Sequence, residues 1–250
     1  MRVAIVGPAE QGPDAGASTV PDSVTLDRQP VGTPLDPDTD FALPVGETAL
    51  LSLVRAAPDC PIVPVDVEAG VPSVPTESLG AAIAALEAGA FETESIPTIA
   101  VSLGDSTYRG LMDVMVVTAE PARISEFRTR KSESDTVVDQ VRADGIVAAG
   151  PAGTPGYSTA AGGPVLDPSL AGLAVIPVGP FRTERPQWVL VPPIEVEVVR
   201  EEVPVSLVVD DEPVERVPAG EPVGLDWGTP IEIGVVEEAV SPLAANGTVQ

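Results

Sequence analysis

The chain after Pro97 is a series of short apolar or alternating runs, and this pattern restricts the second part of the sequence to an all-β fold. Turn residues separate the runs, as at Gly162-Gly163-Pro164, Pro192-Pro193 and Pro218-Ala219-Gly220. The predicted strands are 98–103, 111–118, 122–128, 145–149, 173–178, 188–191, 194–200, 205–209, 223–227 and 231–236. We therefore expect one all-β domain, a sandwich or layered sheet, over residues 98–238.

Residues 1–97 follow a different pattern, in which predicted strands alternate with predicted helices. Apolar runs at 2–7, 24–26, 41–43 and 60–67 indicate strands, and the spacing of Leu50, Leu51 and Val54 indicates a helix that begins at Glu47. A second predicted helix is capped by Thr76 and ends at Gly89, with Leu79, Ala82, Ile83 and Leu86 along one side. This alternation predicts an α/β domain over 1–97, to which the tail 239–250 is expected to return.

The charge balance excludes several classes of function. The chain carries 38 acidic and 13 basic residues, a formal net charge of −25, with one lysine, no histidine and one cysteine, Cys60. No histidine-based catalytic relay or metal site can form, and no cysteine cluster or disulfide can form within the chain. A nucleic-acid partner is not expected, because a basic stripe along the phosphate backbone is missing.

The same balance predicts a saline environment. A strongly acidic chain is often disordered, but 44% of these residues are hydrophobic, so a folded chain is expected. At about 1 M salt the Debye length falls to roughly 3 Å, so surface carboxylates hardly repel one another. We therefore expect a halophilic protein in the cytoplasm, with no membrane partner, since apolar runs of transmembrane length are absent from the sequence.

One stretch combines a strand with a turn made of small residues: Asp144-Gly-Ile-Val-Ala-Ala-Gly-Pro-Ala-Gly-Thr-Pro-Gly-Tyr-Ser-Thr-Ala-Ala-Gly-Gly-Pro164. Small side chains let backbone amides and a short helix approach an anionic or planar ligand. By itself the pattern is also typical of a turn that only packs tightly.

The order of residues in this stretch resembles the NAD kinase family, whose motif Asp-Gly-X-Ile-Val-X-Thr-Pro-Thr-Gly-Ser-Thr-Ala-Tyr-X-X-Ser-Ala-Gly-Gly-Pro aligns with it without a gap. Gly110-Leu-Met-Asp-Val114 resembles the family's Ala-Leu-Asn-Glu/Asp-Val, and Val209-Asp-Asp-Glu212 resembles its Val-Asp-Gly-Gln turn. Asp167-Pro-Ser-Leu170 and Pro177-Val-Gly-Pro180 have counterparts in the same order. The resemblance implies an α/β N-terminal domain, a β-rich C-terminal domain and a nucleotide ligand.

The resemblance also implies a dinucleotide site, with NAD as substrate or ligand. Its residues here are Asp113, Gly153, Thr154, Tyr157 and Ser158. The site departs from the family pattern, because Met112 replaces the asparagine that precedes the acidic residue. Tyr157 can alternatively be a core aromatic residue.

The family's glycine-rich phosphate loop appears here as Val45-Gly46-Glu47-Thr48-Ala49. The resemblance makes Glu47 the catalytic base in place of aspartate, and gives Gly46 and Thr48 to the phosphate loop. An alignment with one glycine deleted, which pairs Thr48 with the family threonine, is equally defensible. Glu47 can alternatively be an N-cap or first-turn acid of the following helix.

Two hypotheses on function follow from the resemblance. In the first, the chain transfers a phosphoryl group from ATP or polyphosphate, with Mg²⁺, to the 2′-hydroxyl of NAD, with activity that is weak or lost. In the second it is a non-catalytic nucleotide-binding or regulatory paralogue. We expect no metal site built from protein ligands. We expect the chain to form a homo-oligomer.

Overall fold

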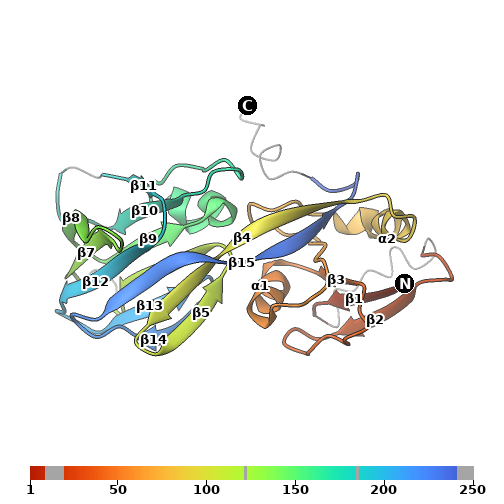
Figure 1. Cartoon of the computed structure of the whole chain (residues 1–250), viewed down its shortest axis with the longest axis horizontal. Helices are drawn as coiled ribbons and strands as arrows, with labels where there is room; N and C mark the ends of the chain where they lie inside the picture. The colour runs from red at the N-terminus through yellow and green to blue at the C-terminus, as the bar shows by residue number, and fades with distance from the viewer. Residues whose placement is uncertain (9–19, 121–122, 184–185, 241–250) are drawn as a thin grey trace. The chain divides into compact units, whose positions relative to one another are not determined.

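The computed structural model describes residues 1–8, 20–120, 123–183 and 186–240 (Figure 1). The chain divides into two compact units. Unit 1 comprises Met1–Ile96 together with the C-terminal residues from Pro230 onward, and unit 2 comprises Pro97–Thr229. Most of the tail 239–250, which was expected to return to the first domain, falls outside the described residues. Among the described residues, no helix has the length and apolar character that crossing a membrane requires.

Unit 1 contains a parallel three-stranded sheet in the order β2-β1-β3. Its elements are β1 (Arg2–Val6), β2 (Thr25–Gln29), β3 (Phe41–Pro44), α1 (Glu47–Ala56), the 3₁₀ turn η1 (Thr76–Ser78) and α2 (Leu79–Glu87). The central strand β1 is buried from Val3 to Val6, as is typical of a parallel sheet covered on both faces. The apolar faces of β1, β3 and α2 form one core cluster, within which Phe41 and Phe91 make an edge-to-face contact.

Two predictions for unit 1 were wrong in detail. The strand expected at 60–67 is reduced to isolated bridges at Ile62 and Val65, because Pro61 and Pro64 have no N–H to donate to a ladder. Thr76 is not a helix cap but the first residue of η1. Asp66, ten residues earlier in the chain, binds the start of this turn instead. Its carboxylate accepts hydrogen bonds from the Thr76 backbone N–H (2.9 Å) and from the Thr76 hydroxyl.

Unit 2 is built from antiparallel strands in two six-stranded sheets. One has the order β11-β10-β9-β6-β13-β14 and the other β5-β4-β15-β12-β7-β8. The strands are β4 (Glu92–Leu103), β5 (Ser106–Gly110), β6 (Asp113–Thr118), β7 (Ser125–Lys131), β8 (Thr136–Ala143), β9 (Gly145–Ala149), β10 (Leu173–Val178), β11 (Trp188–Leu190), β12 (Ile194–Arg200), β13 (Val205–Val209), β14 (Glu212–Arg216) and β15 (Pro222–Val235). The divisions between the units fall inside β4 and β15.

A single apolar core joins the two sheets of unit 2. It includes Val114, Ile146, Val175 and Leu207 from one sheet and Phe127, Val196 and Leu225 from the other. Residues that point into it alternate with more exposed ones along β7, β12 and β13, which is the pattern expected of strands with one buried face. The predicted fold class, α/β followed by an all-β sandwich, is thereby confirmed.

The only basic cluster of the sequence, Arg128-Thr-Arg-Lys131, lies on the β7–β8 hairpin. Arg128 donates to Glu197 (3.3 Å) and Arg130 to Glu195 (2.6 Å), both on the neighbouring strand β12. These cross-strand pairs place carboxylates next to the cluster. The hairpin therefore does not present an unopposed positive patch to a polyanion.

Candidate functional site

The small-residue stretch forms a compact loop at the end of a buried strand. All of β9 is buried, and the chain leaves it through Gly150 into a 3₁₀ turn, Pro151–Gly153, and a single π-helical turn, Thr154–Ser158. Sequence predicted a short helix here. The turn stays irregular because Pro155 lacks a backbone N–H and Gly156 adopts non-helical angles (φ −91°, ψ −126°).

This loop packs directly on the segment that precedes β6. The Gly150 amide donates to the Met112 carbonyl (2.9 Å), and Asp113 lies opposite Ala149 in the β6–β9 ladder. A Cβ built on Gly153 would lie 2.0 Å from the Met112 carbonyl oxygen and 2.3 Å from its carbon. Only glycine permits this approach, so two of the predicted site residues, Asp113 and Gly153, are brought to the same place by backbone contact.

Two further predicted site residues are buried inside the loop. The Thr154 hydroxyl donates to the Pro151 carbonyl (3.1 Å) and accepts from the Leu166 amide (3.0 Å), so it closes the turn. Ser158 is fully buried, and its hydroxyl has no hydrogen-bond partner among the described residues. A Cβ on Gly163 would lie 2.6 Å from that hydroxyl oxygen, which explains why a glycine follows at the Gly162-Gly163 turn.

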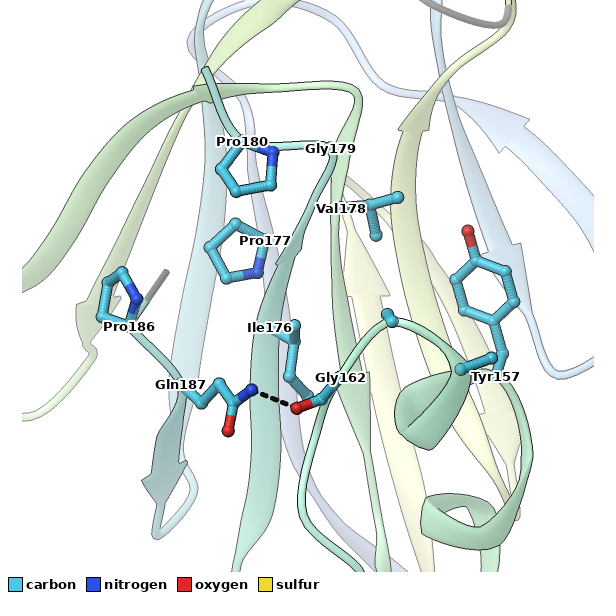
Figure 2. A pocket seen from close by; sticks show the side chains of 11 residues that line it. Tyr157, Gly162, Ile176, Pro177, Val178, Gly179, Pro180, Pro186 and Gln187 are labelled. Carbon is cyan, nitrogen blue, oxygen red and sulfur yellow. Dashed lines mark hydrogen bonds between the residues drawn. The ribbon is translucent and has the colours of Figure 1, made fainter. Parts of the chain in front are cut away.

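Tyr157 is the member of this set that borders a pocket. Its side chain is 46% exposed, so the alternative interpretation as a core aromatic residue is wrong. The pocket, of about 500 Å³, is lined by Tyr157, Ala160, Ala161, Gly162, Ile176, Pro177, Val178, Gly179, Pro180, Pro186 and Gln187 (Figure 2). Gln187 donates its side-chain amide to the Gly162 carbonyl across one side. The walls are mainly apolar with a few polar groups, as in sites for small planar ligands.

The predicted phosphate loop lies in unit 1, between β3 and α1. Val45 is buried, and Gly46 is the N-cap of α1 with a left-handed φ of +82°. Glu47 is exposed in the first turn of α1, where an acid is favoured by the helix dipole, so the N-cap alternative is wrong and the first-turn alternative holds. Thr48 is exposed in the same turn. Gly46 is the only one of these residues without a side chain that would hinder a ligand from approaching the backbone amides.

No cluster of three or more Cys, Asp or Glu side chains that could hold a metal ion occurs in the part of the chain that the structure describes. Mg²⁺ is commonly held by one or two carboxylates together with substrate phosphates.

Two residues of this region, Gly110 and Asp210, were quoted only as members of motifs and were given no role from the sequence. The side chain of Asp210, in the turn after β13, accepts backbone hydrogen bonds from the segment Leu111–Asp113. Gly110 leaves room for that side chain. The Val-Asp-Gly-Gln-like turn was the available signal, but aspartate is common in turns of every kind, so its burial could not be expected from the sequence.

Comparisons with known proteins agree with the geometry of unit 2. Residues 111–228 match the family described as ATP-NAD kinase C-terminal domain. A curated NAD kinase from Methanosarcina mazei is 37% identical over 78 residues, which span 31% of this chain and 26% of that relative. A crystal structure of an NAD kinase from Archaeoglobus fulgidus in complex with ATP aligns with a TM-score of 0.72 at 23% identity, covering 95% of each chain. A yeast NADH kinase complexed with NADH aligns with a TM-score of 0.76 at 15% identity, covering 95% of this chain and 84% of that one.

Proposed function

We propose that the chain is a divergent member of the NAD kinase family that binds a nicotinamide dinucleotide through unit 2 and transfers phosphate to it weakly or not at all; the family match over residues 111–228 and the likeness to archaeal NAD kinases support this. The reaction in question is phosphoryl transfer from ATP or polyphosphate to the 2′-hydroxyl of NAD, which forms NADP. A non-catalytic nucleotide-binding or regulatory paralogue is the second candidate.

The observation that carries the proposal is the packing of the Gly150–Ser158 loop on Met112 and Asp113. A Cβ at Gly153 would lie 2.0 Å from the Met112 carbonyl oxygen, so only glycine allows the loop to pack this closely on the segment that carries Asp113. The loop ends at Tyr157 beside a pocket large enough for a planar ring. Both features lie inside the part of the chain that matches the family.

In this proposal Asp113 recognises a ribose hydroxyl, and Tyr157 covers the ligand at the mouth of the pocket. Gly153, Thr154 and Ser158 shape the loop from inside, since Thr154 and Ser158 are fully buried. A carboxylate suits hydroxyl recognition because it accepts strong charge-assisted hydrogen bonds.

The proposed weakness in catalysis rests on the phosphate loop and on Met112. Phosphoryl transfer depends on positioning and on neutralising charge, and a single glycine, Gly46, leaves few backbone amides accessible to phosphate oxygens. Glu47 would be the base, with a side chain one methylene longer than the family aspartate. Thr48 would contact phosphate at the start of α1. When bound together with a nucleotide, Mg²⁺ would neutralise phosphate charge.

Two expectations about the surroundings remain predictions. A homo-oligomer is favoured by the apolar side chains exposed on unit 2, among them Phe181, Trp188, Val189 and Val191. The halophilic setting rests on the net charge, and the cytoplasmic setting rests on the single cysteine, Cys60.

Substituting asparagine for Met112 should strengthen dinucleotide binding. The substitution would restore a donor and acceptor beside Asp113, and one hydrogen bond to an otherwise unsatisfied polar group contributes about 1–3 kcal/mol, or roughly 5- to 150-fold in affinity. Isothermal titration of NAD into both proteins in molar KCl measures the change. Met112→Leu is the matched control, because it keeps the apolar contact without a hydrogen-bonding group. Absence of NAD binding by the wild-type chain would contradict the proposed function.

A further inference from the structure

Asp210 is a buried acid in a place where acids are usually solvated. It follows β13 as the first residue of the Asp210-Asp211 hairpin turn to β14, adopts a left-handed φ of +54° and is 8% exposed. A buried carboxylate is costly unless hydrogen bonds replace its water, so its contacts indicate its role.

Three successive backbone amides converge on this one side chain. Oδ1 accepts from the amides of Met112 (2.7 Å), Leu111 (3.1 Å) and Asp113 (3.2 Å), and Oδ2 accepts a second bond from Leu111 (3.0 Å). The Asp210 amide donates in turn to the Asp113 carbonyl (2.8 Å). Hydrogen bonds to a charged acceptor are roughly twice as strong as neutral ones. The segment that carries Asp113 is therefore held from both its amide and its carbonyl side.

The approach of the carboxylate depends on Gly110. A Cβ at this position would lie 2.9 Å from Val209 Cγ1 and 3.3 Å from Asp210 Oδ1. Gly110 has a negative φ and needs no special backbone freedom, so the requirement comes from the neighbouring side chains. Gly110 and Asp210 thus meet from two distant parts of the sequence to make one contact.

The Gly150–Ser158 loop packs on this same segment, Leu111–Asp113. The Met112 carbonyl accepts from the Gly150 amide and lies against Gly153. We infer that Asp210 is a positioning residue, whose carboxylate fixes the backbone of Leu111–Asp113 and thereby holds Asp113 and the Gly150–Ser158 loop in the geometry that binds the dinucleotide. This inference rests on the proposed function, since it concerns the same site.

The test compares Asp210→Asn with Asp211→Asn, in which the same chemical change is made one residue further along, on an exposed side chain. Two readouts are needed: hydrogen exchange at the amides of Leu111, Met112 and Asp113, and the Kd for NAD by titration. In Asp210→Asn we expect exchange at these amides to accelerate at least about tenfold and the Kd to rise at least about tenfold, as loss of hydrogen bonds to a charged group implies. In Asp211→Asn both readouts should stay within about twofold of wild type.

Gly110→Ala provides a second route that keeps the charge. By displacing the carboxylate it should reproduce the faster exchange and the weaker NAD binding, which keeps the inference testable should Asp210→Asn not fold. Unchanged exchange in a folded variant, or faster exchange with an unchanged Kd, overturns the positioning role. A wild-type chain that binds no NAD contradicts the proposed function instead, and the exchange data then decide alone whether Asp210 holds the segment.

Discussion

Gly153→Ala is expected to abolish dinucleotide binding and to destabilise unit 2. The new methyl group would lie 2.0 Å from the Met112 carbonyl oxygen, and neither backbone can yield without moving the loop away from Asp113. Overpacking of this kind costs about 1–3 kcal/mol or more, which lowers the Tm of a chain this size by roughly 2–4 °C per kcal/mol. Thermal melts followed by circular dichroism and NAD titration measure the two effects.

Gly150→Ala is the matched control for this substitution. Gly150 lies in the same loop with an extended backbone (φ −74°, ψ 173°), and a Cβ there would meet its nearest neighbour, the Leu111 carbonyl oxygen, at 3.7 Å. Alanine fits at such a site and can stabilise by about 0.4–1 kcal/mol through the unfolded state. If both variants behaved alike, the loop would not depend on the close approach at Gly153.

The Tm of the wild-type chain is expected to rise by roughly 10 °C between 0.1 M and 3 M KCl, which corresponds to about 3–5 kcal/mol. Salt weakens pairs such as Arg128–Glu197 and Arg130–Glu195, but 38 acidic residues face only 13 basic ones, so relief of repulsion outweighs that loss. The Debye length falls from about 10 Å at 0.1 M to about 3 Å at 1 M, so most of the rise should occur below 1 M.

Sucrose at matched osmolality is the control, because it favours the compact state without screening charge. A Tm that stays flat or falls with KCl would contradict the halophilic interpretation.

Strands that form continuous apolar runs, or that alternate buried and more exposed residues, could be located from the sequence. Residues 145–149, 173–178, 194–200 and 205–209 were predicted with the bounds that β9, β10, β12 and β13 have. By contrast, β5 and β14 escaped prediction, since Ser106–Gly110 and Glu212–Arg216 have too few apolar residues to show a period.

Other errors have equally local causes. The runs at 223–227 and 231–236 were predicted as two strands, because Gly228 and Pro230 between them are typical of a turn. In the structure both residues lie within one strand, β15. The burial of individual side chains could not be predicted from the sequence pattern either. Thr154 and Ser158 were assigned to the dinucleotide site, and the sequence pattern does not show that both side chains are fully buried.

The candidate site was found through residue order and not through chemistry. Asp113, Gly153 and Tyr157 have no signature that physical reasoning on a single sequence can separate from an ordinary turn, whereas their order resembles a family. The importance of Asp210 depends on a contact between residues about a hundred positions apart, which no local pattern contains.

The central claim is that dinucleotide binding persists while phosphoryl transfer is weak or absent, and a coupled assay of NADP formation tests it most directly. Misplacing a base by about 1 Å costs on the order of 10²-fold, and each lost donor for developing charge costs about 10²–10³-fold. In molar KCl with NAD, ATP and Mg²⁺, turnover should therefore lie at least about 10³-fold below the roughly 10 s⁻¹ of a typical enzyme. Turnover near that typical value that collapses in Glu47→Gln would contradict the claim and establish Glu47 as a working base.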